Sequence, residues 1–254
     1  MRKRLPVKLY CLCCLILCVN GTARGQLSDS ALLNESLLKI IAVHDQALGE
    51  NIRLYNGSAN PGYNHISIGN PYFQADLVQP GSIFYDGIIY RQVQMLYDLV
   101  QDNVVIVQFS DNSLSPEYRN SLRMDLIRDR VGWFTVAGHD FIRLDADSNS
   151  IKMKDGFYDR VYNGNIKVLI KRTKKYEEEV KGSELERRYD VVDYYYILKD
   201  GRYHNIKNKK SILQLFKMKK KELSMFARKN KLKFKKNREN YITGMSRYYD
   251  QLIK

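Results

Sequence analysis

Short apolar runs interrupted by turn residues dominate the middle of the chain, from about residue 53 to residue 206. The runs are rich in Tyr, Val and Ile, which favour strands, and many of them alternate apolar with polar positions. Asp86-Gly87, Asn163-Gly164 and Asp200-Gly201 are typical of type I′ turns, in which both central residues need a positive φ. Turns at this frequency leave no room for crossover helices, so the pattern predicts an antiparallel, meandering sheet.

Two further segments of this β-rich zone are interpreted from the runs that flank them. Apolar runs on both sides of Gly138-His139 predict another hairpin turn. The charged stretch from Glu177 to Glu184 lies between two strand-like runs. We expect this stretch to form a long hairpin loop rather than a boundary between domains.

Helical spacing precedes the β-rich zone. Leu33, Leu37 and Ile40 follow N-cap candidates at residues 28–30, and Gly49 stands where a C-cap would. This pattern predicts a helix within residues 26–52. His44 lies on the apolar face of that helix, where we interpret it as a half-buried core histidine rather than a ligand.

The last zone of the chain, residues 207–254, predicts two amphipathic helices. In the first, apolar residues share one face and basic residues the opposite face. The apolar face is Ile212, Leu215, Phe216, Leu223 and Phe226, and the basic face is Lys210, Lys217, Lys221 and Arg228. Lys219 falls within the apolar face, which indicates a snorkelling side chain or an irregularity. The second helix, residues 238–253, has Asn237 as its N-cap candidate and Glu239 as its first-turn acid.

These zones together define the expected architecture. Residues 231–234 alternate basic and apolar side chains between the two helices and predict a short extended link. We predict an α+β fold, in which an antiparallel, Tyr-rich, meandering β-sheet carries an N-terminal helix and two C-terminal amphipathic helices. The single mature domain, residues 26–254, divides into a helix (26–52), a β-rich body (53–206) and a basic helical end (207–254).

The first 25 residues have the three parts of a secretory signal peptide. A basic start is followed by an apolar run, residues 9–19, which is too short to span a bilayer. Ala23 and Gly25 are the small residues expected before a cleavage site, so we expect cleavage before Gln26. The mature chain is then exported to the periplasm or the cell surface.

All four cysteines lie within this segment, at Cys11, Cys13, Cys14 and Cys18. The mature chain therefore has no cysteine for a disulfide, a thiolate metal site or a nucleophile. Lipidation at Cys18 is the alternative to cleavage before Gln26. A lipoprotein signal normally has a small residue before the modified Cys, and Leu17 is not small.

The net charge of +14 is unevenly distributed along the chain. Residues 26–163 have a net charge of −6, whereas residues 203–254 hold 16 basic and three acidic side chains. One interpretation is a contact with an anionic partner: lipid headgroups, an acidic polysaccharide, nucleic acid or the acidic β zone of a neighbouring molecule. The other is a solvated face, with part of its charge offset by the β body. Export, the excess of Lys over Arg and the lack of a nucleic-acid-binding motif disfavour nucleic acid.

The sequence shows no catalytic motif with a physical rationale. It has no Gly-x-Ser-x-Gly, His-Glu-x-x-His, phosphate-binding Gly-Lys-Ser/Thr or Gly-x-Gly-x-x-Gly pattern. His65, His139 and His204 are interpreted as polar histidines of turns, and His139 beside Asp140 is not a dyad because neighbouring strand residues point to opposite faces. Other aspartates have no distinguishing pattern; these include Asp86, Asp98, Asp159 and Asp193.

Residues 145–149 place Asp and Asn at alternate positions, as a calcium loop does. Ser150 stands where that loop needs Gly, and Gly156 where it needs Glu, so we expect a polar hairpin loop. We therefore predict no catalytic, cofactor-binding or metal-binding residue and no cofactor, and the sequence favours a protein that is not an enzyme.

Several short motifs carry a resemblance to a known group of proteins. They are Leu54-Tyr55-Asn56-Gly57, Gly69-Asn70-Pro71-Tyr72-Phe73, the run from Gly81 to Tyr90, Tyr97-Asp98, Asp155-Gly156-Phe157-Tyr158 and Tyr162-Asn163-Gly164. With these motifs the chain resembles uncharacterised exported proteins of Bacteroidota-type bacteria over most of its mature length. The resemblance implies a periplasmic or surface location and no known activity.

Our first functional hypothesis is an exported, non-enzymatic binding or scaffold protein of the bacterial envelope. Its basic C-terminal helices would face an anionic envelope surface or an acidic glycan through Lys210, Lys217, Lys221 and Arg228. The alternative is a small-ligand carrier that holds a lipid or glycan in a curved β-sheet. An enzyme with dispersed carboxylates is the third hypothesis, and the oligomeric state stays open.

Overall fold

The computed structural model describes residues 53–63, 67–74, 76–109, 121–145, 153–181 and 184–253. All of these except Arg53 belong to one compact unit, Leu54–Lys254. The predicted signal peptide, the predicted N-terminal helix with His44, and His65 lie outside the described residues. Most of the calcium-loop candidate, residues 146–149, lies outside them too.

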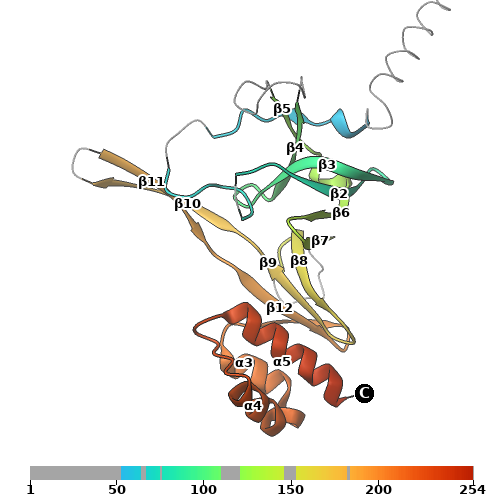
Figure 1. Cartoon of the computed structure of the whole chain (residues 1–254), viewed down its shortest axis with the longest axis vertical. Coiled ribbons are helices and arrows are strands. Elements are labelled where there is room, and N and C mark those ends of the chain that lie inside the picture. The colour runs from blue at the N-terminus through green and yellow to red at the C-terminus, as the bar shows by residue number, and fades with distance from the viewer. Residues whose placement is uncertain are drawn as a thin grey trace, which may run out of the picture. The chain divides into compact units, whose positions relative to one another are not determined.

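The described part of the chain is mostly antiparallel β-sheet followed by helices, as predicted (Figure 1). Its main sheet has eleven strands in the order β1-β5-β4-β3-β2-β6-β7-β8-β9-β12-β13, so most strands pair with their neighbours in sequence. The strands of this sheet are β1 (Ser58–Ala59), β2 (Gln79–Tyr85), β3 (Ile88–Asp98), β4 (Asn103–Phe109), β5 (Ser121–Asp125), β6 (Val131–Val136), β7 (His139–Leu144), β8 (Gly156–Asn163), β9 (Lys167–Lys171), β12 (Tyr194–Lys199) and β13 (Arg202–Asn205). A 3₁₀ turn, η3 (Arg128–Arg130), precedes β6.

Two of the three predicted type I′ turns form as expected. In Asp86-Gly87 the φ values are 51° and 81°, and in Asp200-Gly201 they are 51° and 72°. The turn predicted at Gly138-His139 lies one residue earlier, with positive φ at Ala137 and Gly138. Asn163-Gly164 is not such a turn. Asn163 ends β8 without a positive φ, because Asp250 of the last helix binds the following loop and sets its conformation.

The predicted loop from Glu177 to Glu184 is instead mostly strand. Strands β10 (Lys174–Lys181) and β11 (Glu184–Val191) form a separate two-stranded sheet. They follow β9 and precede β12 along the chain. Cross-strand ion pairs stabilise it, with Arg187 Nε 2.9 Å from Glu178 and Arg188 Nη2 3.1 Å from Glu177. The high charge of the segment suggested a loop, but Glu177 and Glu178 face arginines across the ladder, although Glu179 faces Glu186.

Aromatic side chains fill the core against the first half of the sheet. Tyr97, Phe134, Phe141 and Phe157 are each at most 1% exposed. The ring centroids of Tyr97 and Phe134 both lie 4.8 Å from that of Phe141, and Phe134 lies 5.1 Å from Phe157. These rings pack on one another, so this part of the sheet is stabilised by a filled core.

The first predicted C-terminal helix is divided in two. The structure has α3 (Lys209–Leu215), a 3₁₀ turn η4 (Lys217–Lys219) and α4 (Lys220–Lys229). The irregularity that the sequence indicated at Lys219 therefore exists. The break lets Phe216 stack on Tyr249 at 4.1 Å and stay 1% exposed, while Lys219 remains at the surface.

The second predicted helix is α5 (Arg238–Leu252), and Asn237 caps it by accepting a hydrogen bond from Asn240 N at 2.8 Å. Of the predicted extended link, residues 231–234, Leu232 and Lys233 lie between turns, and a turn begins at Phe234 because Lys233 O accepts hydrogen bonds from Lys236 N and Asn237 N. The helices pack on β9 and β12 through a second core of buried side chains. Its largest members include Phe216 and Tyr241.

Candidate functional site

The four basic residues predicted to face an anionic partner are all exposed on the helical end. Lys210 belongs to α3, Lys217 begins η4, and Lys221 and Arg228 belong to α4. The structure brings Lys210 and Lys217 together in one hollow, which we name hollow A. Lys221 and Arg228 lie on α4 and do not line it.

Hollow A lies beside α3 and the start of α4 and has a volume of about 650 Å³. Four lysines, one apolar side chain and one amide line it. These residues are Lys209, Lys210, Leu213, Gln214, Lys217 and Lys220. A capping box starts α3 at this point, since Asn208 Oδ1 accepts a hydrogen bond from Ser211 N and Ser211 Oγ accepts one from Asn208 N.

A second hollow, hollow B, has a volume of about 840 Å³ and is lined by residues 207–210, 232–235, Arg238 and Tyr241. Lys209 and Lys210 line both hollows, so the two are adjacent. We call their joint lining the basic surface. No acidic side chain is among these lining residues.

Several cations of the basic surface were not singled out from the sequence. Three of them lie before or beside the predicted basic face of the helix: Lys207, Lys209 and Lys220. Lys233 and Lys235 come from the segment between α4 and α5, which lies beside the start of α3. A wheel drawn for one continuous helix could not bring these segments together, because the break at η4 and the return of the chain are tertiary features.

The three acidic residues of the helical end do not neutralise the basic surface. Glu239 is held by Arg172 of the β body, with 2.8 Å between Nη1 and Oε2. Asp250 is 2% exposed and faces the loop after β8. Glu222 lies 4.0 Å from Lys219, and neither of these two lines a hollow of the basic surface. Each acid of the segment is therefore engaged elsewhere.

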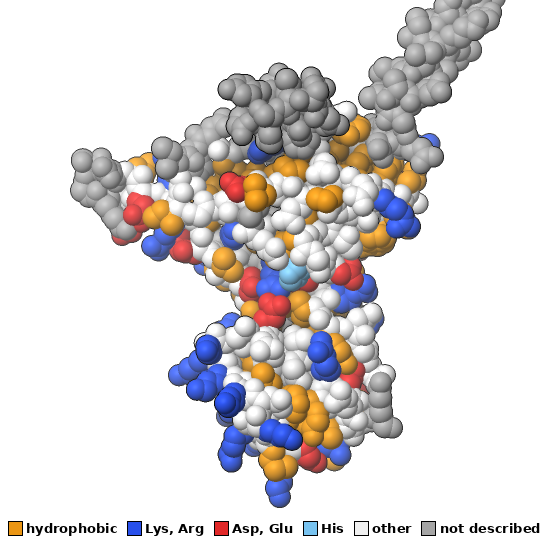
Figure 2. All heavy atoms as spheres, in the orientation of Figure 1, with side chains coloured by type: hydrophobic (Ala, Val, Ile, Leu, Met, Phe, Trp, Pro, Cys, Tyr) orange, Lys and Arg blue, Asp and Glu red, His pale blue; other side chains and the backbone are white. Residues whose placement is uncertain are grey.

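The positive charge of the basic surface remains exposed to solvent. Within the described ranges, no Lys or Arg of this surface forms an ion pair with a carboxylate. Lys and Arg side chains gather over the helical end in the space-filling view (Figure 2). Such a surface attracts anions, with a strength that salt reduces. The sequence left open that the acidic β body neutralises part of this positive charge within the molecule. Such neutralisation is not seen among these residues.

A buried charge cluster fixes α5, and with it part of the basic surface, on the sheet. Arg172 Nη2 donates to Asp159 Oδ2 at 2.6 Å, and its Nη1 donates to Asp193 at 2.9 Å and to Glu239 at 2.8 Å. Burial alone would lower the pKa of Arg172, but its hydrogen bonds to Glu239 and Asp159 outweigh this and raise the pKa. Burial raises the pKa of Asp193 despite the neighbouring Arg172.

No sequence pattern distinguishes the aspartates of these buried networks. Asp159 is 1% exposed and Asp98 is fully buried. His139, expected as a polar turn histidine, begins β7 and places Nδ1 2.8 Å from Asp159 Oδ2. Asp140, its neighbour, binds Arg160 instead. Burial raises the pKa of Asp98, whose Oδ2 accepts a hydrogen bond from the Tyr63 hydroxyl at 2.7 Å.

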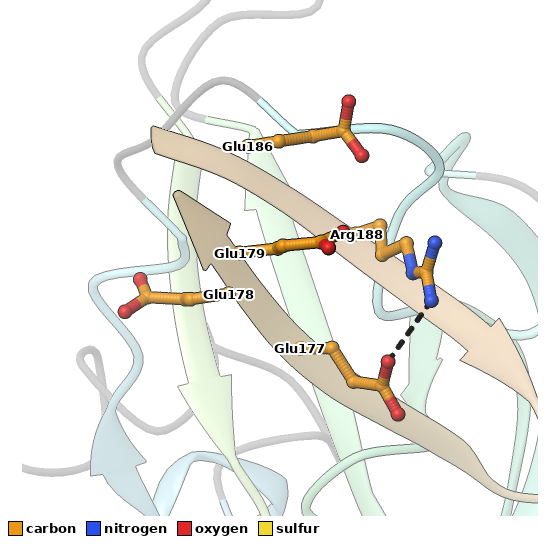
Figure 3. Close-up of a pocket in the computed structure, with 5 residues that line it drawn as sticks. All are labelled: Glu177, Glu178, Glu179, Glu186 and Arg188. Atoms are coloured by element: carbon orange, nitrogen blue, oxygen red, sulfur yellow. Dashed lines mark hydrogen bonds and ion pairs between the residues drawn. The ribbon is translucent and has the colours of Figure 1, made fainter. Parts of the chain in front are cut away.

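The β10–β11 hairpin carries a hollow of the opposite charge (Figure 3). Its volume is about 290 Å³, and Glu177, Glu178, Glu179, Glu186 and Arg188 line it. Glu178 points away from the other carboxylates, and Arg188 reaches Glu177. Among the described residues, no group of three or more His, Cys, Asp or Glu side chains is placed to hold a metal ion.

Known proteins give no guide to the role of the basic surface. No family model, no curated protein and no solved structure matches the chain. The described residues contain no helix with the length and apolar composition needed to cross a membrane. What the surface can do follows from its chemistry: exposed ammonium groups with apolar side chains between them can hold a chain of regularly spaced anionic groups.

Proposed function

We propose that this chain is an exported, non-enzymatic protein of the bacterial envelope that binds an acidic glycan through the basic surface. The observation that carries the proposal is the lining of hollows A and B, which holds eight Lys or Arg side chains and no carboxylate. The sequence features of residues 1–25 support export. Export also places the protein where acidic polysaccharides occur and nucleic acids are scarce.

The geometry of the basic surface favours a polymer over a small anion. The two hollows are adjacent, open and together larger than a single charged group needs. Leu213, Leu232 and Phe234 lie between the lysines and offer apolar contact to a sugar backbone. Repeated weak contacts along a polymer add up, because binding at one site raises the effective concentration at the next.

In the first half of the sheet the carrier hypothesis draws no comparable support. The large aromatic side chains of the first half of the sheet, such as Tyr97 and Phe141, pack on one another in the core. Native mass spectrometry of the protein purified from its host tests this alternative directly. A lipid or glycan retained in stoichiometric amount, and insensitive to salt, would favour the carrier over the proposed surface.

Binding of the full chain to polygalacturonate, with neutral dextran as the comparison, tests the proposed function. We expect salt-sensitive binding to polygalacturonate and none to dextran. The triple variant Lys209→Gln, Lys210→Gln, Lys217→Gln should lose roughly tenfold or more in affinity. The control triple variant Lys221→Gln, Arg228→Gln, Lys229→Gln removes the same charge from α4 outside the two hollows and should lose less.

Two results would contradict the proposal. If both triple variants lose affinity equally, total charge rather than the basic surface governs binding. If the wild-type chain binds neither polygalacturonate nor vesicles that contain phosphatidylglycerol, the anionic partner is wrong altogether. The mature N-terminus provides a separate test of export: we expect Gln26 by mass spectrometry, whereas a lipid-modified Cys18 would replace this expectation with a membrane-anchored protein.

A further inference from the structure

A long groove lies beside the basic surface and is lined mainly by the second half of the sheet. Its volume is about 850 Å³. The loop between β3 and β4, strands β8, β9 and β12, and the first residue of α5 contribute to its lining. Lys207 and Arg238 line both the groove and hollow B, so the groove continues the basic surface. A polymer bound in hollow B can therefore extend into it.

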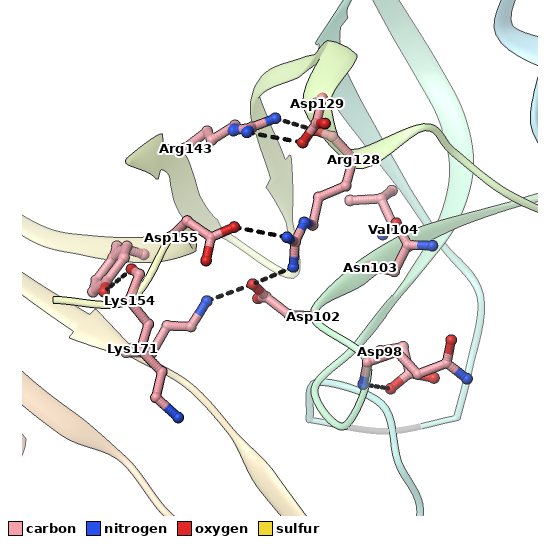
Figure 4. A network of polar contacts seen from close by, with 12 residues as sticks. Asp98, Asp102, Asn103, Val104, Arg128, Asp129, Arg143, Lys154, Asp155 and Lys171 are labelled. Atoms are coloured by element: carbon pink, nitrogen blue, oxygen red, sulfur yellow. Dashed lines mark hydrogen bonds and ion pairs between the residues drawn. The ribbon is translucent and has the colours of Figure 1, made fainter. Parts of the chain in front are cut away.

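Part of the groove consists of charges that satisfy one another (Figure 4). Lys171 Nζ lies 2.5 Å from Asp102 Oδ2, and the Tyr97 hydroxyl donates to Asp102 Oδ1 at 2.6 Å. Arg128 Nη2 lies 2.7 Å from Asp155 Oδ2. Burial lowers the pKa of Lys171, and its contact with Asp102 partly offsets this. These matched pairs give the groove a rigid wall and leave little net charge there.

The remaining cations of the groove have no carboxylate partner. Among the described residues, Lys154, Lys175, Lys207 and Arg238 form no ion pair, and all four are exposed. Lys174 is bound by neutral oxygens only, at 2.7 Å from both the Asn70 and the Tyr72 carbonyl groups. The groove is thus positive along its open side, as the basic surface is.

Aromatic and neutral polar groups distinguish the groove from hollows A and B. Tyr194, at the start of β12, lines the groove and is 44% exposed. The Arg238 guanidinium, which lines both the groove and hollow B, lies 5.5 Å from the ring centroid of Tyr195. Thr173 and Asn205 add hydroxyl and amide groups to the lining. A tyrosine ring beside hydrogen-bonding groups suits a sugar ring, which has an apolar face and polar edges.

We infer that the groove is a subsite that selects sugar rings carrying carboxylate groups, with Tyr194 against the ring and Lys154 and Lys175 for the carboxylates. This inference rests on the proposed function and names the ligand of the same continuous surface. A run of Asp or Glu residues would satisfy the cations but has no ring to place on Tyr194. An anionic lipid would satisfy the cations through its headgroup, but its acyl chains would meet the charged side of the groove.

The test compares three probes on the full chain by calorimetry. They are an oligomer of galacturonic acid, its methyl ester, and polyglutamate of the same charge as the oligomer. We expect the wild-type chain to prefer the oligomer over polyglutamate by roughly fivefold, and to bind the methyl ester weakly. Tyr194→Ala should remove the preference over polyglutamate, whereas Tyr194→Phe should keep it and verifies that the fold is intact.

Matched variants separate the groove from the rest of the surface. Tyr176→Ala removes another partly exposed tyrosine, which does not line the groove, and should leave the preference unchanged. The double variant Lys154→Gln, Lys175→Gln should weaken oligomer binding more than Lys229→Gln, Lys236→Gln does, although the change in charge is equal.

The outcomes distinguish this inference from the proposed function. If both acidic probes bind through the basic surface but Tyr194→Ala keeps the preference, or the wild-type chain has none, the inference is overturned and the proposed function stands. If the methyl ester binds as tightly as the acid, or phosphatidylglycerol vesicles bind more tightly than the oligomer, the carboxylated sugar is the wrong ligand. If neither acidic probe binds, both proposals fail.

Discussion

Arg172 Nη1 lies 2.8 Å from Glu239 Oε2 and thereby joins the end of strand β9 to the first turn of helix α5. The two residues are 67 positions apart in the chain. Arg172 also holds Asp159, whose side chain is only 1% exposed. This contact is one polar link between the β body and the helices that carry the basic surface, and it supports the first prediction.

Replacing Arg172 with Met should destabilise the protein strongly. The variant leaves the buried carboxylate of Asp159 without its cation, so the free energy of unfolding should fall by about 3–5 kcal/mol. Urea denaturation followed by circular dichroism measures the change. Arg187→Met is the matched control, since its partner Glu178 is exposed, and it should cost far less than Arg172→Met. Equal losses in the two variants would contradict a structural role for the buried cluster.

Replacing Asp250 with Ala should also destabilise the fold. Its carboxylate accepts hydrogen bonds from the Tyr162 hydroxyl at 2.9 Å and from Asn165 N at 2.8 Å. The carboxylate is 2% exposed and its two donors are only partly buried, so the variant should lose about 1–3 kcal/mol of unfolding free energy. Gln251→Ala, at the exposed neighbouring position, should change the stability by less than about 0.5 kcal/mol. A small effect of Asp250→Ala would show that water replaces these contacts.

Gly156→Ala should cost more than Gly87→Ala, although both glycines have a positive φ. Gly87 has open space around it, so Ala there adds only the backbone strain of about 1–2 kcal/mol. A Cβ at position 156 would overlap Asp102 Oδ2 and lie 2.5 Å from Lys171 Nζ, so it would also disrupt that ion pair. Thermal unfolding of the two variants measures the difference. Equal melting temperatures would contradict the tight packing of the ion pair against β8.

Stability should fall as the pH rises above 10. Burial raises the pKa of Tyr97 well above its ordinary value of 10.0 and raises that of Tyr189 to about 12. The unfolded chain then releases tyrosine protons at a lower pH than the folded chain does, and this favours unfolding with increasing pH. Burial lowers the pKa of Lys171, and this acts in the opposite sense. The tyrosines whose pKa is raised outnumber the lysines whose pKa is lowered.

Urea denaturation at a series of pH values from neutral to strongly alkaline checks this dependence. Tyr158→Phe removes one of the tyrosines whose pKa burial raises and should make the fall less steep. Tyrosinate absorbance of the folded protein should appear at a higher pH than that of the unfolded chain. A free energy of unfolding that stays constant above pH 10 would contradict the burial of these hydroxyl groups.

Local patterns in the sequence predicted most elements of the fold. The meandering sheet, the turns at Asp86-Gly87 and Asp200-Gly201, and the cap at Asn237 each depend on residues close together in the chain. The failures at Asn163-Gly164 and in the β10–β11 hairpin have a common cause. In both places a contact between distant or paired segments, such as Asp250 with Asn165, overrides the local preference.

By itself the sequence determined that the chain has a β-rich body and a strongly basic helical end, because strand periodicity, turn chemistry and charge are local properties. Only the tertiary structure decided which cations act together. Lys210 and Lys217 share a hollow with Lys209, whereas Lys221 and Arg228 do not line it. Arg172 forms an ion pair with Glu239, so this acid does not neutralise the basic surface. Such pairings depend on how distant segments pack, and a single sequence does not encode them in any local pattern.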